Sequence, residues 1–305
     1  MPPDFPPDEE HHRIFEAFTQ LIRVLKGQPL VLFVDDIHWI DVSTLDWLVY
    51  LADRMLAEPL LLVTTYRPSE ASSLVSQTIA GWGRLGILRR LTLGRFTPKE
   101  TASLLQALNG NTDRLDELQT RSAGNPYFLV ELSQAQPGDL PPALVDLIRA
   151  RLDRLPDTAR QVLQAAAVLE SELELTTLRR TSGRGEEETL NSLDTLLAAD
   201  VIREENNGYE FTHPLVATVV RNNLSMARRS FLHRRAAEAL EAGYTNRRSI
   251  IAGTLAEHYS QAGRSDLAAE YADIAAGRAL KLTALPEAIF FYRQAFKMSP
   301  TPERQ

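Results

Sequence analysis

Two adjacent aspartates, Asp35 and Asp36, are the residues of this chain whose type and position could do chemistry. They follow an uninterrupted apolar run at residues 30–34, which would hold them rigidly at the end of a buried strand. Mg²⁺ takes carboxylate oxygens from proteins, usually one or two, and a second acid can orient a water for attack on a phosphate. The pair is therefore consistent with a Mg-nucleotide site, and equally with a capped strand that enters a turn.

The elements that must position these aspartates are strands of a sheet. A second apolar run spans residues 60–65, and Thr64, Thr65 and Arg67 end or follow it. Continuous apolar runs are typical of strands buried on both faces, and a helix between them, at residues 43–58 with Asp41 or Ser43 as N-cap, predicts a parallel sheet. Functional residues of such sheets lie just past the carboxyl ends of strands, so both polar groups are expected there.

Two further elements complete this predicted α/β part. Residues 88–93 form a shorter apolar run, which we interpret as a third strand. Upstream, apolar residues recur at helical spacing between His11 and Lys26, and Gly27 ends that helix. Residues 1–10 are rich in proline and acidic residues, and we expect a disordered tail there.

The bulk composition narrows the class of protein. The chain has 305 residues, room for two or three domains. It has no cysteine, which excludes disulfides and thiolate metal sites and fits an intracellular, cytoplasmic location. The net charge of −7 argues against a nucleic-acid-binding polycation. The apolar runs are too short to span a bilayer, and the N-terminus does not read as a secretory signal.

The remainder of the chain is predicted to be mostly helical. Residues 97–134 read as helices with a break at Gly124-Asn125-Pro126, and residues 136–142 have the composition of a linker. Three or four short helices are expected over residues 143–200. They precede a hairpin around Asn206-Asn207-Gly208, and this order suggests a winged helix. From Pro214 onward the pattern is helical, and a tetratricopeptide-like spacing is formed by Ala288, Tyr292, Ala295 and Pro300.

Several segments together resemble one family. Residues 30–45 (LVLFVDDIHWIDVSTL) look like the Walker B region of STAND-class ATPases, P-loop proteins related to AAA+. The closest resemblance is to bacterial LuxR-type and adenylate-cyclase-associated regulators, over residues 13–282. The other matching segments follow in the family's order: the sensor strand at 64–68, the Gly-x-Pro motif at 124–131, the entry into the winged helix at 147–155 and 165–169, and the histidine segment at 209–215.

This resemblance implies a fold and a set of domains. The fold would be a partial α/β P-loop NTPase domain with a parallel sheet, followed by a winged helix and helical repeats similar to tetratricopeptide repeats. The implied parts are a tail at 1–10, a nucleotide-binding domain with helical lid at 11–135, a linker at 136–142, a winged helix at 143–225 and repeats at 226–305. The implied activity is slow ATP hydrolysis, or use of ATP and ADP with Mg²⁺ as a signalling switch.

The resemblance also implies roles for individual residues. Asp35 would bind Mg²⁺ through water or directly, Asp36 would be the catalytic acid or the water-positioning group, and Arg67 would sense the γ-phosphate. Gly124, Asn125 and Pro126 would pack beside the adenine. His213 would contact the ADP β-phosphate and lock the winged helix in the resting state.

Simpler interpretations accompany each of these roles. Arg67 could form a surface ion pair, the Gly-Asn-Pro sequence breaks a helix in any case, and His213 could end a strand and cap the next helix. Trp39 is interpreted as a packing residue.

The phosphate-binding loop that should accompany such a site is missing. No Gly-x-x-x-x-Gly-Lys-Ser/Thr occurs in the 305 residues, so the backbone cradle and the phosphate-binding lysine are absent from this sequence. In the family the strand of that loop lies between the sensor strand and the last strand, so residues 60–65 and 88–93 would flank an empty place. We therefore expect the C-terminal part of a longer regulator, inactive as an ATPase on its own, with a degenerate relative that pairs with a partner chain as the alternative.

Two other functions compete with this one. A DNA-binding winged helix would read DNA with residues 186–200, which contain five acidic residues and no lysine or arginine, so direct nucleic-acid binding is not expected. A non-enzymatic scaffold would bind protein partners, or oligomerise, through its helical repeats. The pairs Arg228-Arg229 and Arg234-Arg235 suit a solvated face or an interdomain contact, with a site for an acidic partner as the alternative.

Overall fold

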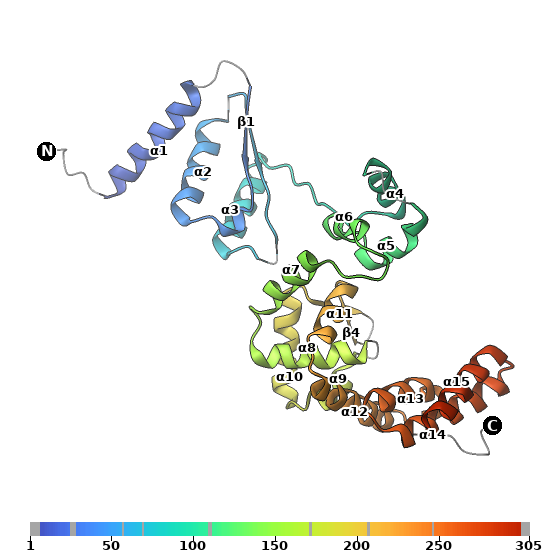
Figure 1. Ribbon diagram of the computed structural model, residues 1–305. Helices are drawn as coiled ribbons and strands as arrows, with labels where there is room; N and C mark the ends of the chain where they lie inside the picture. Colours follow the sequence, from blue (N-terminus) through green and yellow to red (C-terminus); the bar gives the residue numbers. More distant parts are fainter. Residues whose placement is uncertain are drawn as a thin grey trace. The chain divides into compact units, whose positions relative to one another are not determined.

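The chain divides into two compact units, Met1–Leu93 and Gly94–Gln305. The computed structural model describes residues 7–24, 29–56, 58–68, 70–108, 112–170, 173–205, 208–245 and 247–299 (Figure 1). Over these residues the protein has fifteen α-helices and two separate two-stranded sheets. None of the described helices is long and apolar enough to cross a membrane.

The first unit is a strand–helix–strand arrangement with additional helices. Its elements are α1 (Pro7–Val24), β1 (Leu30–Val34), the 3-10 helix η1 (Ile37–Trp39), α2 (Val42–Arg54), β2 (Leu60–Thr64) and α3 (Ser73–Arg84). The strands are parallel, in register from Leu30 opposite Leu60 to Val34 opposite Thr64, which confirms the predicted pairing. Asp41 is the N-cap of α2, because its side chain accepts a 3.0 Å hydrogen bond from the Thr44 amide.

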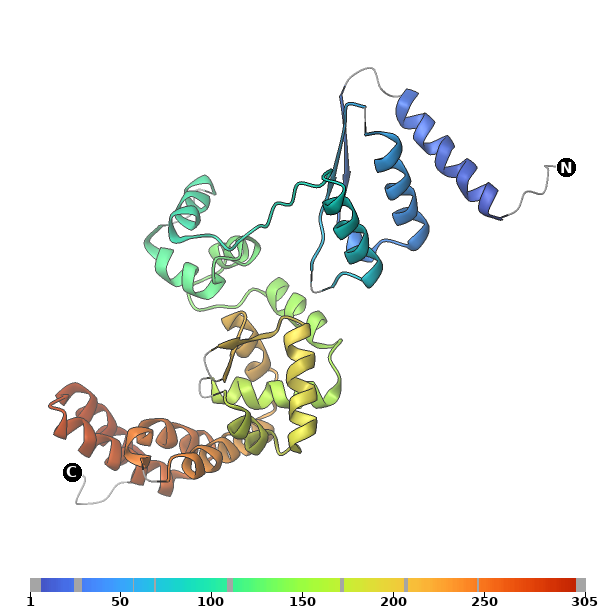
Figure 2. The ribbon, with the colours of Figure 1, turned by 180° about the vertical axis from the view of Figure 1, so that it is seen from behind.

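One face of this sheet is covered and the other is exposed. Helices α2 and α3 lie on the same side of the strand pair (Figures 1 and 2), and Val34 packs there against a buried cluster of Ile37, Leu45, Val75 and Ile79. On the other face, Val31, Phe33 and Leu61 are 58–61% exposed. The expectation of strands buried on both faces was therefore wrong, because the helices between and after the strands cover only one side.

Two other predictions for this unit need correction. Residues 88–93 form no strand, and Leu91 and Leu93 are more than 80% exposed. Among the described residues no neighbouring strand is available to pair with their backbone, and an unpaired apolar run has no reason to extend regularly. At the N-terminus, α1 begins at Pro7, inside the expected tail of residues 1–10. Residues 1–6 lie outside the described part.

The second unit begins with three lid helices and continues into a helix–hairpin segment. The lid helices are α4 (Pro98–Ala107), α5 (Leu115–Ser122) and α6 (Pro126–Gln134), with the 3-10 helix η2 (Thr112–Arg114) between the first two. The helix–hairpin segment contains α7 (Pro142–Leu152), α8 (Asp157–Leu169), α9 (Leu175–Ser182), α10 (Glu186–Ala198), β3 (Ile202–Glu205), β4 (Gly208–Phe211) and α11 (Pro214–Asn222). The hairpin is antiparallel as expected; the turn residues Asn206 and Asn207 are not among those described.

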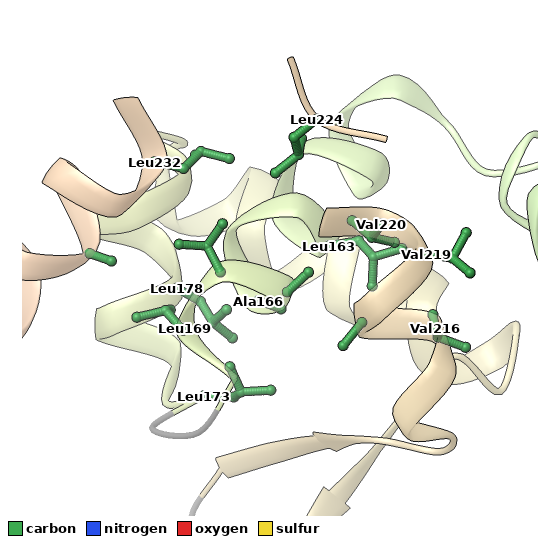
Figure 3. Packing of buried hydrophobic residues seen from close by; sticks show 14 of the residues in the cluster. Leu163, Ala166, Leu169, Leu173, Leu178, Val216, Val219, Val220, Leu224 and Leu232 are labelled. Carbon is green, nitrogen blue, oxygen red and sulfur yellow. The ribbon is translucent and has the colours of Figure 1, made fainter. Parts of the chain in front are cut away.

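The core of the second unit is built around α8. Eight of its thirteen residues are buried, so the helix is covered on most of its circumference. Leu163, Ala166 and Leu169 of α8 lie among Val216, Val219 and Val220 of α11 and Leu178 of α9 (Figure 3). The same cluster extends back to the lid through Leu118 and Leu129. The lid helices therefore share a core with the helix–hairpin segment, and the chain divides into its two compact units before them, between Leu93 and Gly94.

The last part of the unit is a run of packed helices. It comprises α12 (Met226–Gly243), the 3-10 helix η3 (Arg248–Ile250), α13 (Ala252–Gln261), α14 (Ser265–Lys281) and α15 (Leu285–Met298). Alanines of α14 are buried between neighbours, among them Ala268, Ala272 and Ala276 at 0% exposure, because a small side chain lets helices approach closely. Of the repeat-like set, Ala288 and Ala295 are buried, Tyr292 is exposed, and Pro300 is not described.

The two arginine pairs of α12 make contacts inside the unit. Arg229 donates to the Arg221 carbonyl at the end of α11 (2.7 Å), and Arg235 donates to the Arg180 carbonyl at the end of α9 (3.0 Å). Cationic groups stabilise the carbonyl ends of helices. Arg229 and Arg235 thus make contacts between helices, while Arg234 forms a surface ion pair with Glu238.

Candidate functional site

Asp35 and Asp36 lie directly after β1, and Thr65 lies directly after β2. The Thr65 hydroxyl donates a short hydrogen bond to the Asp35 carboxylate and accepts one from the Asp36 amide at 2.9 Å. The Thr65 carbonyl accepts from the Ile37 amide at 2.9 Å, and its own amide donates to Val34 at 3.2 Å. One threonine therefore fixes the whole turn that carries both carboxylates, at the carboxyl end of the two parallel strands.

The backbone of Asp36 is in the left-handed conformation, with φ 52° and ψ 47°. Aspartate tolerates this region better than most residues, but it still costs about 1 kcal/mol. The two carboxylates differ in their contacts: Asp35 accepts from the Thr65 hydroxyl, while the Asp36 side chain is 42% exposed. Asp35 is also an exposed residue, so both acids are open to solvent at the strand end, and backbone strain such as that of Asp36 is concentrated at functional sites.

The turn after β2 supplies a cation and a further acid. Arg67 is 61% exposed and donates to Glu70 at 2.8 Å, so it does form the simple surface ion pair considered above. His38 of η1 is fully buried near Asp36 and Glu70. Trp39 is 65% exposed, and its ring contacts that of His38 with centroids 5.1 Å apart, so the packing expected of it is a surface contact. No motif pointed to Glu70, although its position three residues after Arg67 was the available signal.

The oxygen atoms at this edge suit a hard cation such as Mg²⁺. Asp35, Asp36 and Thr65 supply carboxylate and hydroxyl oxygens, which Mg²⁺ prefers. Within the described residues no group of three or more acidic or histidine side chains is close enough to hold a metal by itself. Because Mg²⁺ in nucleotide sites is held by one or two carboxylates together with phosphate oxygens, the donor set fits an ion that arrives with a nucleotide.

The predicted adenine segment forms a tight loop between α5 and α6. Asn125 is the N-cap of α6, where its side-chain oxygen accepts from the amides of Tyr127 (3.0 Å) and Phe128 (3.3 Å). Gly124 has φ +73°, and a Cβ there would run into the Phe96 carbonyl oxygen. Only glycine fits this position. The structural role expected for Gly-Asn-Pro126 is confirmed, and its contact with adenine stays a prediction.

His213 lies between β4 and α11 and contacts the lid. Burial lowers its pKa to about 4, so the ring is neutral near pH 7. Its Nδ1 accepts from the Leu215 amide at 3.2 Å, which caps α11 as one simple interpretation predicted. The remaining N–H must then be at Nε2, and it donates to the Ser122 carbonyl at 2.6 Å. The ring also packs edge-on against Phe128 of α6, with centroids 4.4 Å apart.

Arg95 makes a second connection beside His213. Its guanidinium donates to the Ala123 carbonyl at 3.1 Å and to the Thr212 carbonyl at 2.9 Å. It thus binds the lid loop and the residue before His213 at once. No sequence motif pointed to Arg95, because the two carbonyls that it joins are 89 residues apart along the chain, between positions 123 and 212.

The candidate residues therefore form two groups. The first group lies at the strand ends of the first unit. It consists of Asp35 and Asp36, which are hydrogen-bonded to Thr65, and Arg67, which is paired with Glu70. The second group, within the second unit, consists of Gly124, Asn125, Pro126 and His213, which meet through the loop that contains Ser122.

Comparison with known proteins gives few matches. No known protein family matches the chain. An uncharacterized protein of Rhizobium meliloti (strain 1021) is 29% identical over 282 residues, which cover 84% of this chain. The chain spans about a quarter, 26%, of that protein's length. Among solved structures, the chain is similar to a Signal Transduction ATPase with Numerous Domains with a tetratricopeptide repeat sensor from Pyrococcus horikoshii. Identity is 16%, the TM-score is 0.41, and the match covers 94% of this chain and 41% of that one.

Proposed function

We propose that this chain is the switch part of a STAND-class signalling ATPase of the bacterial LuxR-type or adenylate-cyclase-associated kind. The observation that carries the proposal is the Thr65 hydroxyl, which binds both Asp35 and the backbone of Asp36 at the carboxyl end of two parallel strands. Such an edge is where α/β sheets bind ligands. Arg67 follows the neighbouring strand β2 by three residues and adds a cation, which is paired with Glu70.

Each residue would have one task at this edge. Asp35 would hold Mg²⁺, oriented by the hydroxyl of Thr65. Asp36, whose backbone is left-handed and whose side chain is 42% exposed, would position the attacking water. Arg67 would leave Glu70 and bind the γ-phosphate, since an exposed ion pair is weak enough to exchange for a phosphate. The ion supplies charge neutralisation at the phosphates when it is bound.

The second group of residues would transmit the nucleotide state. His213 and Arg95 hold the helix–hairpin segment, which we propose is a winged helix, against the lid loop at 122–125. A nucleotide that draws His213 away from Ser122 would release this contact. Order and docking changes of this type are a common way to convert bound nucleotide into a signal.

Within the described residues β2 pairs with β1 alone, and the phosphate-binding part would pair with its other edge. Along that edge lies a groove of about 310 Å³, lined mainly by apolar residues of α2, β2 and the segment after α3, among them Met55, Leu62, Trp82 and Leu88. An unpaired strand edge beside an apolar groove suits the addition of one more strand. We propose that this strand carries the phosphate loop and comes from a longer form of the protein, located in the cytoplasm.

Titration calorimetry with Mg-ATP tests the proposal. The chain alone should bind weakly or not at all, and the chain extended by the segment encoded directly upstream should bind. Asp35→Asn in the extended form should weaken binding of Mg-ATP more than binding of ATP in a metal chelator, because the residue acts through the ion. An extended form that carries a phosphate loop and yet binds no nucleotide would reject the proposal.

A second candidate is a scaffold that binds protein partners through the helical repeats. The observation that favours it is α15, on which Ile289 and Phe290 are 51% and 55% exposed. Exposed apolar side chains on a terminal helix of a stacked array suit a further helix or a partner. This candidate gives no role to the acidic strand end. Replacing Ile289 and Phe290 by glutamine should abolish partner capture under the scaffold hypothesis and leave nucleotide binding unchanged.

A further inference from the structure

His38 lies beside Asp36 and Glu70, and the roles proposed above do not use its chemistry. Its side chain is fully buried, and neither ring nitrogen has a hydrogen-bond partner within the described part of the protein. Buried polar groups are nearly always paired, since an unpaired one loses its contacts with water and gains nothing in return. An imidazole held in this way points to a partner that it meets in another arrangement of its neighbours.

Two carboxylates lie on opposite sides of the ring. Nδ1 is 3.7 Å from an Asp36 oxygen, and Nε2 is 3.6 Å from a Glu70 oxygen. Both distances exceed a hydrogen bond by less than about 1 Å, so a small rotation closes either one. A neutral imidazole has a single N–H, and it can therefore donate to Asp36 or to Glu70 but not to both. The two acids compete for one donor.

Glu70 also binds Arg67, which completes a chain of four side chains. Arg67 donates to one oxygen of Glu70 at 2.8 Å, while the other oxygen faces His38. The chain Arg67–Glu70–His38–Asp36 thus connects the proposed phosphate sensor after one strand with the proposed water-positioning acid after the other. Along the backbone, Asp36 and Arg67 are separated by α2 and β2.

We propose that His38 and Glu70 are positioning residues that couple Arg67 to Asp36. While Arg67 holds Glu70, the imidazole carries its proton on Nδ1 and donates to Asp36. When Arg67 turns to a phosphate, Glu70 takes the N–H at Nε2, and Asp36 loses its donor and is free to bind water. The charge of the ring does not change in this step, because one proton leaves Nδ1 and one joins Nε2, exchanged with water through the partly exposed carboxylates. The coupling rests on the proposed function of Arg67 and Asp36.

Nitrogen NMR of ¹⁵N-histidine-labelled protein tests the coupling without any nucleotide. The chain has six histidines, so the ring signals can be assigned, and His38→Gln identifies the signal of His38. The shifts of Nδ1 and Nε2 show which nitrogen carries the proton. Arg67→Gln should move the ratio of the two tautomers severalfold toward Nε2–H. Arg84→Gln is the matched control, since it removes an exposed arginine of the same unit and should leave the ratio unchanged.

The two acids give a sharper test, because their effects should be opposite. Asp36→Asn removes one competitor and should favour Nε2–H, whereas Glu70→Gln should favour Nδ1–H. Changes in the same direction, or a ratio unmoved by Arg67→Gln, would overturn the coupling and leave His38 as a packing residue. Calorimetry with Mg-ATP separates this result from the proposed function: a moved ratio without nucleotide binding in the extended form keeps the coupling and rejects the ATPase. Nucleotide binding by the extended form, with a tautomer ratio that Arg67→Gln leaves unchanged, keeps the proposed ATPase function and rejects the coupling.

Discussion

His213 donates a 2.6 Å hydrogen bond to the carbonyl of Ser122, a residue 91 positions earlier in the chain. The same ring caps α11 through its other nitrogen and packs against Phe128. Both nitrogens and one edge of a single side chain are therefore occupied by three different segments. This arrangement makes His213 the residue whose loss should most directly loosen the lid.

Replacing His213 with asparagine should destabilise the second unit by about 2–4 kcal/mol. Asparagine can still cap α11, but it is too short to reach Ser122 and leaves that buried carbonyl unpaired beside a cavity. Urea unfolding followed by circular dichroism measures the change. His12→Asn, at an exposed position of the first unit, is the control and should have little effect. A loss below about 0.5 kcal/mol would show that the hydrogen bond contributes little.

Gly124→Ala should be far more harmful than Gly138→Ala. Both glycines have positive φ, +73° and +86°, so each alanine variant suffers the backbone cost of about 1 kcal/mol. Only at Gly124 does the new Cβ meet a backbone oxygen, that of Phe96, while nothing lies within 4 Å at Gly138. We expect a total of about 3 kcal/mol or more at Gly124. Equal melting temperatures for the two variants would contradict the close approach.

Stability of the second unit should fall as the pH is lowered below neutrality. Burial lowers the pKa of His213, His233 and His258 to about 4, against an ordinary value of 6.5. Between these values the unfolded chain binds protons that the folded chain does not, so the free energy of unfolding decreases as pH falls through this window.

Urea midpoints measured between about pH 7 and pH 5 check this pH dependence, since most carboxylates stay ionised over that range. His213→Asn should flatten the slope and His12→Asn should not. If the unfolding free energy changes with pH equally in the unchanged protein, His213→Asn and His12→Asn, then His213 is not a source of the acid sensitivity.

Thr65→Val should destabilise the first unit by about 1–3 kcal/mol, although the shape of the side chain is retained. Valine cannot donate to Asp35 or accept from the Asp36 amide, and both groups then lack their partner. Thr64→Val, one residue earlier at the end of β2, is the matched control and should be neutral, because valine suits a strand. Thermal unfolding of the unchanged protein, Thr65→Val and Thr64→Val measures the difference. Equal melting temperatures for the three would mean that Thr65 does not hold the turn.

Local patterns predicted the elements of the fold well where a contact is close in sequence. The two parallel strands, the Asp41 cap and the β3–β4 hairpin all follow from periodicity or from neighbouring residues. The expected third strand failed because a strand exists only with a partner, and residues 88–93 have none among the described residues. The burial of β1 and β2 was overestimated for a similar reason: an apolar run shows what could be covered, not what covers it.

The candidate site was predictable only in part. Asp35, Asp36 and Arg67 were found because they end apolar runs, which is a local signal. Glu70 and Arg95 were missed because their meaning depends on partners reached through the fold, His38 for one and Thr212 for the other. Thr65 was recognised as part of a segment, but its two hydrogen bonds to the aspartate turn depend on the strand register.

The exposed sheet face formed by Val31, Phe33 and Leu61 has a thermodynamic consequence. Whatever covers this face gains free energy mainly by releasing ordered water from apolar surface, a gain that is entropic near room temperature. Association there should carry a negative change in heat capacity and should weaken on cooling. Cold storage would then favour the separated chain, and gentle warming would favour its assembly with the missing cover.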